Sequence, residues 1–307
     1  MLPAAMKRTI ACLLFVEVVA AAQSAPRRLR SLKGHQNFVT ALAFGKAGKL
    51  LASASTDGTV RLWDPVAEKL VRTIALPEGD LATGLCVTPD GARVIASVDA
   101  SVIAWSADKG DEAWRRGVGG AVRAIALSGD GSLVAVAAGD VRILGGESGE
   151  ETQKLAAADV TALALSADGA TLATAGAGGV KLWDRATGKA RKTLSEGLGA
   201  ASLAFSADGR RLAAAGDDSQ VHVYDVEVGA EIWAKPELAS GTTVAIDGKL
   251  VIAGFGLKRL AAWGLEKGDD KWWVQDRGAE IHIFAVAPGV KRIATGGPDG
   301  VVVLWGP

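Results

Sequence analysis

The sequence predicts an all-β fold, a seven-bladed β-propeller built from four-stranded antiparallel blades. Three observations lead to it: a large apolar position recurs every 39 to 42 residues, apolar and small residues alternate ahead of it, and Asp-Gly turns separate the runs. A repeat of about forty residues is typical of four-stranded propeller blades. The recurring position is occupied by Trp63, Trp105, Leu144, Trp183, Tyr224, Trp263 and Trp305.

Each unit contains the same succession of strands and turns. The first strands are expected at 38–44, 121–127, 159–165 and 200–205, where apolar residues alternate with a period of two. The turns that follow carry Asp-Gly, a pair that tolerates positive φ, so we interpret their aspartates as turn formers and not as ligands. These pairs begin at Asp90, Asp130, Asp168, Asp208 and Asp247.

The two ends of the chain are expected to close the ring. The seventh unit stops after its third strand, at Pro307, whereas an unassigned strand, 28–32, precedes the first unit. Pairing of this strand with the last one would leave no open sheet edge. We therefore predict one propeller domain over 23–307, with 28–32 as the blade-closing strand.

The first 22 residues are predicted to be a secretory signal peptide. Lys7 and Arg8 precede an apolar run that ends in small residues at Ala20 and Ala22. The run is short for a bilayer span and contains Glu17, so no stable membrane insertion is expected after cleavage. These features predict an exported bacterial protein, periplasmic or secreted. Cys86 would then be the last cysteine, and we interpret it as a small buried hydrophobe.

The first unit resembles the WD-repeat family. It combines Gly34-His35, a Leu-Ala-Ser ending at Ser53, an aspartate at 57 and a Leu-Trp-Asp ending at Asp64. The resemblance covers the chain from about residue 29 to 307, although Gly-His is lost from the other units. It implies a buried hydrogen-bond network of Asp57, His35, Ser53 and Trp63. Asp99, Asp218 and Asp299 occupy the aspartate position in other units, where the partners of the network are missing.

The sequence contains no recognisable catalytic or metal-binding motif. Its three histidines fall in separate units, which argues against a built-in metal site. The charge is balanced, with 34 basic and 34 acidic residues, so nucleic-acid binding is not expected. Gly110, Gly229 and Gly268 each precede a tryptophan by four residues, which resembles the tryptophan-docking repeat of quinoprotein propellers. We favour a packing role, in which the glycine turns and the tryptophan packs between blades, and expect Trp273 to point outward, away from its neighbour Trp272.

The resemblance places partner binding on the face that carries the loops between units and the second turn of each unit. These loops are rich in carboxylates, so we expect there a cationic protein partner or a divalent ion at the mouth of the channel. The alternative is that exposed turns are simply rich in Asp. The candidate partner-binding residues are Glu78, Asp80, Asp159, Glu196, Asp217, Phe255, Arg259, Arg277 and Glu280. The overall expectation is an exported, monomeric, noncatalytic protein-interaction scaffold without a cofactor. A quinoprotein-like propeller enzyme and a subunit of an envelope assembly remain alternatives.

Overall fold

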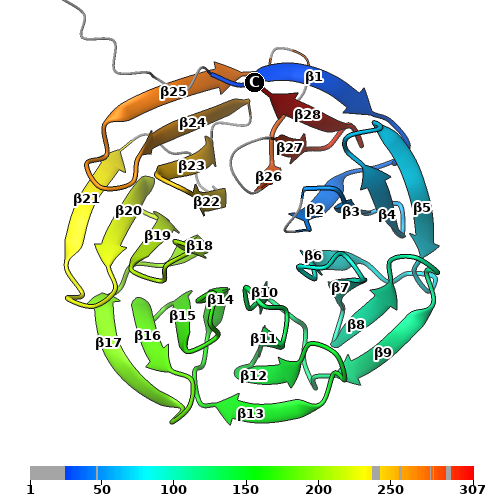
Figure 1. Cartoon of the computed structure of the whole chain (residues 1–307). Helices are drawn as coiled ribbons and strands as arrows, with labels where there is room; N and C mark the ends of the chain where they lie inside the picture. The colour runs from blue at the N-terminus through cyan, green and yellow to red at the C-terminus, as the bar shows by residue number, and fades with distance from the viewer. Residues whose placement is uncertain are drawn as a thin grey trace, which may run out of the picture.

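Seven four-stranded antiparallel sheets are arranged around a central channel in the computed structural model (Figure 1). The structure describes residues 25–45, 48–236, 243–255 without the side chain of Phe255, 258–276, 278, 280–287 and 292–307. The described residues form strands and turns, so none of them belongs to a helix that would cross a membrane. The predicted fold class is confirmed, whereas the predicted signal peptide lies outside the described residues.

In every blade the four strands lie side by side from the channel outward, and they follow the same order from first to fourth. The innermost strands of blades 1 to 7 are β2 (Val39–Phe44), β6 (Ala82–Val87), β10 (Ala124–Leu127), β14 (Val160–Leu165), β18 (Ala200–Phe205), β22 (Thr243–Asp247) and β26 (Ile283–Val286). The second strands are β3 (Leu51–Ser55), β7 (Arg93–Val98), β11 (Leu133–Ala138), β15 (Thr171–Gly176), β19 (Arg211–Gly216), β23 (Leu250–Phe255) and β27 (Ile293–Gly296).

The outer half of each blade contains the strand that ends at the recurring apolar position and one solvent-facing strand. The third strands are β4 (Thr59–Asp64), β8 (Ser101–Ser106), β12 (Asp140–Gly145), β16 (Val180–Asp184), β20 (Gln220–Asp225), β24 (Arg259–Gly264) and β28 (Val302–Gly306). The outermost strands are β5 (Lys69–Ala75), β9 (Glu112–Gly117), β13 (Glu151–Leu155), β17 (Lys189–Ser195), β21 (Glu231–Pro236), β25 (Asp270–Gln275) and, in blade 7, β1 (Arg27–Leu32).

The ring is closed by the two ends of the chain, as predicted. Strand β1 pairs antiparallel with β28, from Arg27 opposite Gly306 to Leu32 opposite Val302. The closing strand thus begins at Arg27, one residue before the predicted start. Arg27 also donates from Nε to the carbonyl of Pro307 at 2.9 Å. Blade 7 is therefore assembled from both ends of the chain, which leaves no unpaired edge at the seam.

The hydrophobic core lies between blades and not within them. The buried residues fall into seven clusters, and each cluster joins side chains of two neighbouring blades. The seam between blades 1 and 2, for example, packs Leu62 of β4 against Val94 and Trp105 of blade 2. Alternation along each strand supplies both faces of a blade with apolar side chains, so every seam is filled.

Blade 1 contains the hydrogen-bond chain that the resemblance implies. The Trp63 indole donates to Ser53 Oγ at 2.8 Å, Ser53 Oγ donates to His35 Nε2 at 2.8 Å, and His35 Nδ1 donates to Asp57 Oδ2 at 2.9 Å. Thr59 adds a hydroxyl that donates to Asp57 Oδ1 at 2.6 Å. The chain ties β4 and β3 to the segment that leads into β2, and it satisfies polar groups that burial would otherwise penalise.

Burial and these hydrogen bonds fix the charge states in the network. Burial lowers the pKa of His35, so the ring is neutral and can accept from Ser53 while donating to Asp57. Burial of Asp57 acts in the opposite direction on its carboxyl, but hydrogen bonds from Thr59, His35 and the backbone N–H of Gln36 outweigh it and lower its pKa to about 2. The network is therefore a neutral imidazole beside a carboxylate.

The glycine and tryptophan pattern of the outer strands is a packing device between blades. Gly110 and Gly268 adopt positive φ in the turn after the third strand, as predicted, and Trp114 and Trp272 are buried. The tryptophan packs on the next blade's turn, because a Cβ at Gly149 would collide with Trp114, and one at Gly268 with Trp233. Each of these indoles also donates to that next blade, Trp114 to the Gly146 carbonyl and Trp233 to the Leu265 carbonyl. Trp273 points outward and is 59% exposed, as expected from alternation.

Candidate binding face

Two kinds of loop meet on one side of the ring, which we call the loop face. They are the connections between blades and the turns between the second and third strands. Within blade 1 the Thr56 N–H donates to the Phe38 carbonyl at 2.9 Å, and across the seam between blades 1 and 7 the Val39 N–H donates to the Gly297 carbonyl at 3.0 Å. The remaining turns lie on the opposite side, which we call the turn face. The loop face is thus a continuous surface held by backbone hydrogen bonds.

Most carboxylates of the turn face are used within the fold. Each aspartate of the Ser/Thr-x-Asp-Gly turns accepts a hydroxyl hydrogen bond from the residue two positions earlier, at 2.5 to 2.6 Å. These bonds lower the pKa values of the carboxyls. The four aspartates are Asp90, Asp130, Asp168 and Asp208. Some other acids of this face are paired with cations, as in the contact of Asp225 with Arg211 at 2.7 Å, whereas Asp111, Glu150 and Glu227 are exposed and form no ion pair with a described residue.

Four predicted carboxylates of the loop face have no such role. Glu78, Asp159, Glu196 and Asp217 are exposed, and none of them forms an ion pair with a described residue. They come from the connections into blades 2, 4 and 5 and from the second turn of blade 5. The Asp217 carboxylate lies over Gly199, where a Cβ would approach its Oδ2 to 2.6 Å. Unpaired exposed carboxylates are free to contact a partner.

The other predicted binding residues differ from these four. Asp80 is half-buried, and Glu280 accepts from His282 Nε2 at 3.2 Å, beside the channel. Arg259 lies over the ring of Trp273, 5.0 Å from its centroid, which directs it toward the outer wall. Phe255 ends strand β23 and does not lie in a loop, and its side chain is outside the described part. Arg277 also lies outside the described residues.

Blade 5 contains a polar cluster that the sequence analysis missed. Asp218 lacks the partners of the blade 1 network, since Ala214 stands at the register position of Ser53. It has another partner, because its Oδ2 lies 3.0 Å from His222 Nε2. The other ring nitrogen of His222 lies 2.8 Å from Glu231, and the ring stacks on Tyr224. Two further blades keep half of the network, through Trp183 bonded to a threonine at 2.8 Å and Trp305 bonded to another at 3.0 Å. A histidine four residues after the turn aspartate was the available signal.

The channel is hollowed at both faces. On the turn face a cavity of about 660 Å³ is lined by apolar residues that include Cys86, with Asp130 and Asp247 at its mouth. Burial raises the pKa of the Cys86 thiol to about 12, so this group is an uncharged, weakly nucleophilic part of the wall. On the loop face a cavity of about 280 Å³ is lined by hydroxyl and apolar side chains and by Arg123.

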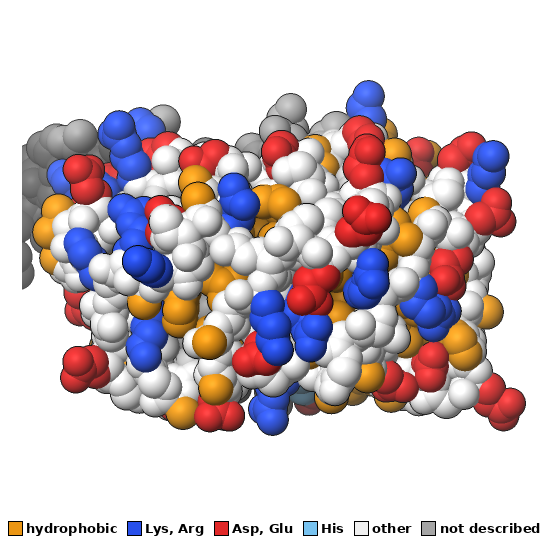
Figure 2. All heavy atoms as spheres, turned by 90° about the horizontal axis from the view of Figure 1, so that it is seen from below, with side chains coloured by type: hydrophobic (Ala, Val, Ile, Leu, Met, Phe, Trp, Pro, Cys, Tyr) orange, Lys and Arg blue, Asp and Glu red, His pale blue; other side chains and the backbone are white. Residues whose placement is uncertain are grey.

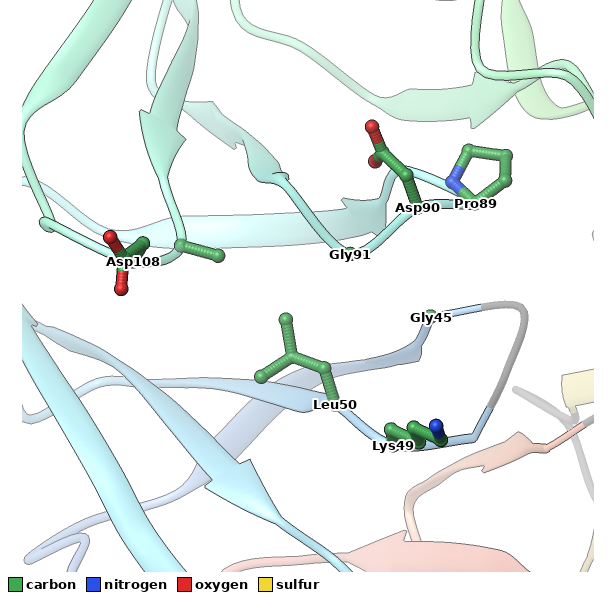
Figure 3. Close-up of a pocket in the computed structure, with 8 residues that line it drawn as sticks. Gly45, Lys49, Leu50, Pro89, Asp90, Gly91 and Asp108 are labelled. Atoms are coloured by element: carbon green, nitrogen blue, oxygen red, sulfur yellow. The ribbon is translucent and has the colours of Figure 1, made fainter.

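A third cavity of about 280 Å³ lies between the turns of blades 1 and 2 (Figure 3). Leu50 and Pro89 provide its apolar lining, while Lys49, Asp90 and Asp108 lie around it. Two of these polar residues form hydrogen bonds within the protein. The Asp90 carboxylate accepts from the Thr88 hydroxyl, and the backbone carbonyl of Asp108 accepts from Arg72. Among the residues that the structure describes, no three His, Cys, Asp or Glu side chains are grouped so that they would hold a metal ion.

Comparison with known proteins agrees with this architecture. The family pattern described as "WD domain, G-beta repeat" matches residues 26–64, 149–184 and 190–225. The chain is 37% identical over 86 residues to the periodic tryptophan protein 2 homolog of Schizosaccharomyces pombe, covering 27% of this chain and 10% of that protein. It is 26% identical over 250 residues to telomerase protein component 1 of Rattus norvegicus, covering 76% of this chain and 10% of that protein.

A shorter match is to the human WD repeat-containing protein 18, at 50% identity over 44 residues, or 14% of this chain and 10% of that protein. The chain thus spans about a tenth of the length of these relatives. Each matched repeat covers the outermost strand of one blade and the first three strands of the next, since residues 149–184 contain β13 of blade 3 and β14 to β16 of blade 4. Three matches to the family pattern within a ring of seven four-stranded blades identify the chain as a WD-repeat β-propeller.

Proposed function

We propose that the chain is a noncatalytic protein-interaction scaffold whose loop face binds a cationic region of a protein partner. The observation that carries this proposal is the group of exposed, unpaired carboxylates on the loop face. Glu78, Asp159, Glu196 and Asp217 are unpaired with any described residue, whereas the four Asp-Gly aspartates of the turn face are bound by hydroxyls. Asp111, Glu150 and Glu227 are among the comparable described acids of the turn face. Membership of the WD-repeat family supports the scaffold role by analogy.

Electrostatics makes this face suited to a basic partner. Exposed carboxylates keep their hydration and their full negative potential, so they attract Lys and Arg side chains and accelerate association. The outer wall shows a different distribution: Figure 2 shows acidic, basic and hydrophobic side chains interspersed along it. In that view no charge of one sign gathers, so the side of the wall that it shows offers no comparable docking surface.

Export forms part of the proposal. Residues 1–22 would direct the chain out of the cytoplasm, and the propeller would then act in the periplasm or outside the cell. Intact-mass measurement of the chain recovered from the exported fraction of a bacterial host tests this directly. A mass that corresponds to a chain starting at Gln23 is the expected result, and an uncleaved chain retained in the cytoplasm would contradict it.

The docking face can be mapped by zero-length crosslinking. The full chain is incubated with a partner captured at low salt and treated with a carbodiimide, which joins carboxylates to lysines in contact. We expect crosslinked peptides that contain Glu78, Asp159, Glu196 or Asp217. Crosslinks confined to the turn-face carboxylates Glu150 and Glu227, which lie in the turns after β12 and β20, would overturn the proposed face.

A further inference from the structure

The loop-face end of the channel contains one charged side chain in an otherwise neutral wall. Seventeen of the described residues line this cavity, and among them Arg123 is the only one with a charge. The remaining lining residues are apolar or carry a hydroxyl, and the hydroxyl-bearing ones are Thr83, Ser97, Thr161, Ser202 and Thr243. A guanidinium at such a place has no built-in counter-charge within the cavity.

The side chain of Arg123 makes no polar contact with a described residue that would give it a role in stabilising the fold. Its backbone N–H donates to the Ala137 carbonyl at 2.9 Å, but its exposed guanidinium forms no hydrogen bond or ion pair with any described residue. Several other arginines contact carboxylates: Arg211 contacts both Asp225 and Glu266, and Arg28 contacts Asp276. Five N–H donors of Arg123 are thus available in a fork that matches a carboxylate.

The hydroxyls around Arg123 differ in what they can offer. Thr161 Oγ1 donates to the Ala200 carbonyl of the next blade at 3.0 Å, so its proton is committed. Thr83 Oγ1 and Ser97 Oγ lie 3.1 Å apart, and a hydrogen bond between them uses one proton and leaves the other free. Thr243 forms no hydrogen bond through its hydroxyl to any described residue. The cavity therefore provides a guanidinium and two hydroxyl donors.

We propose that this end of the channel binds one carboxylate, from an Asp or Glu side chain of the protein partner, with Arg123 as its main contact. The inference deepens the proposed function, and it names the partner surface more closely: basic residues over the acidic loops around a single acidic residue at the channel. A cavity of about 280 Å³ admits such a side chain but not a folded element. An acidic residue flanked by lysines satisfies both the loops and the channel.

Titration with blocked peptides tests the site without the native partner. The arginine Nε–H signals of the ¹⁵N-labelled full chain are followed while acetate, a Lys-Lys-Glu-Lys-Lys peptide or its Lys-Lys-Gln-Lys-Lys analogue is added. We expect a saturable shift of the Arg123 signal with the glutamate peptide, a weaker one with acetate and none with the glutamine peptide. Arg123→Gln should weaken glutamate-peptide binding about tenfold or more.

The matched control is Arg210→Gln, which removes an exposed arginine from the turn between β18 and β19 on the turn face. This variant should bind the glutamate peptide as the unmodified chain does. Equal shifts with the glutamine peptide, or equal losses in both variants, would overturn the site. Acetate binding as tightly as the glutamate peptide would overturn its assignment to a protein side chain. Because no native partner is used, this test can fail while the crosslinking test of the loop face succeeds, and the reverse also holds.

Discussion

Blades 1 and 3 reach the same architecture with opposite chemistry. Blade 1 buries the polar chain from Trp63 to Asp57, whereas blade 3 has Val136 at the register position of Ser53 and Leu144 at that of Trp63, both fully buried. Blade 3 also has a shorter second turn, in which Ala138 pairs directly with Asp140 around Gly139. A blade therefore needs two filled faces and correct turns, and the polar network is one of two ways to fill them.

The largest expected effect is the loss of His35 from blade 1. His35→Ala leaves Ser53 Oγ and Asp57 Oδ2 without their buried partner and opens a cavity, so we expect unfolding to become easier by about 2–4 kcal/mol. Denaturant unfolding followed by tryptophan fluorescence measures it, with the exposed Lys33→Ala as control. A change no larger than the control's would mean that the network contributes nothing that blade 3 lacks.

Exchanging the central residue between the two blades sharpens the comparison. Ser53→Val leaves the Trp63 indole N–H and His35 Nε2 without their hydrogen-bond partner. Val136→Ser buries a hydroxyl with no polar side chain at the equivalent positions. Each substitution should lower the free energy of unfolding by about 2–3 kcal/mol. Differential scanning calorimetry of both variants measures the loss. If either exchange were neutral, the two blades would be interchangeable in side-chain chemistry and the comparison would fail.

Acid should weaken blade 1 and not blade 3. The pKa of His35 is lowered from 6.5 in the fold, and that of Asp57 is lowered to about 2, so the unfolded chain binds more protons at both groups. Their stabilisation is complete above about pH 6.5 and declines as the pH falls, first through His35 and then through Asp57. The stability difference between the unmodified chain and His35→Ala should therefore shrink from neutral pH toward about pH 4. A constant difference over this range would contradict the assigned charge states.

The smallest effect is expected at Thr59, at the edge of the network. Thr59→Val removes the hydroxyl that donates to Asp57 Oδ1 at 2.6 Å but keeps the shape of a β-branched residue, so about 1 kcal/mol of stability should be lost. The shift in urea midpoint measures it. A loss as large as that of His35→Ala would show that Thr59, which was not among the predicted members, is central to the network.

The fold was predictable because its determinants are local and repeated. Alternation, the spacing of the residues from Trp63 to Trp305 and the Asp-Gly turns define strands and their order, and Leu32 at the seam fits the predicted closure. The network of blade 1 was predictable because one unit keeps every member. Side-chain pairings between distant positions were not predictable from the sequence. His222 contacts both Asp218 and Glu231 only because the third and fourth strands of blade 5 are paired.

The candidate site was only partly predictable for the same reason. The sequence indicated that loops rich in carboxylates share one face, but it could not show that Arg259 stacks on Trp273. Nor could it show Arg123 as the single charge among the described residues that line the loop-face cavity, because the channel wall is made of one strand from each of seven units. Its hydroxyl neighbours Thr83 and Thr161 lie about forty residues away in either direction.

Charge reversal on the two faces tests the central claim, that the loop face binds a cationic partner. The affinity of the captured partner is measured for the unmodified chain, for Glu78→Lys, Asp159→Lys and Asp217→Lys combined, and for the turn-face control Asp111→Lys, Glu150→Lys and Glu227→Lys combined. Both triple variants change the net charge equally and alter exposed side chains. The account predicts a loss of about tenfold or more for the loop-face variant, mainly through slower association, and little change for the control. Equal losses in both, or none in the loop-face variant, would contradict it.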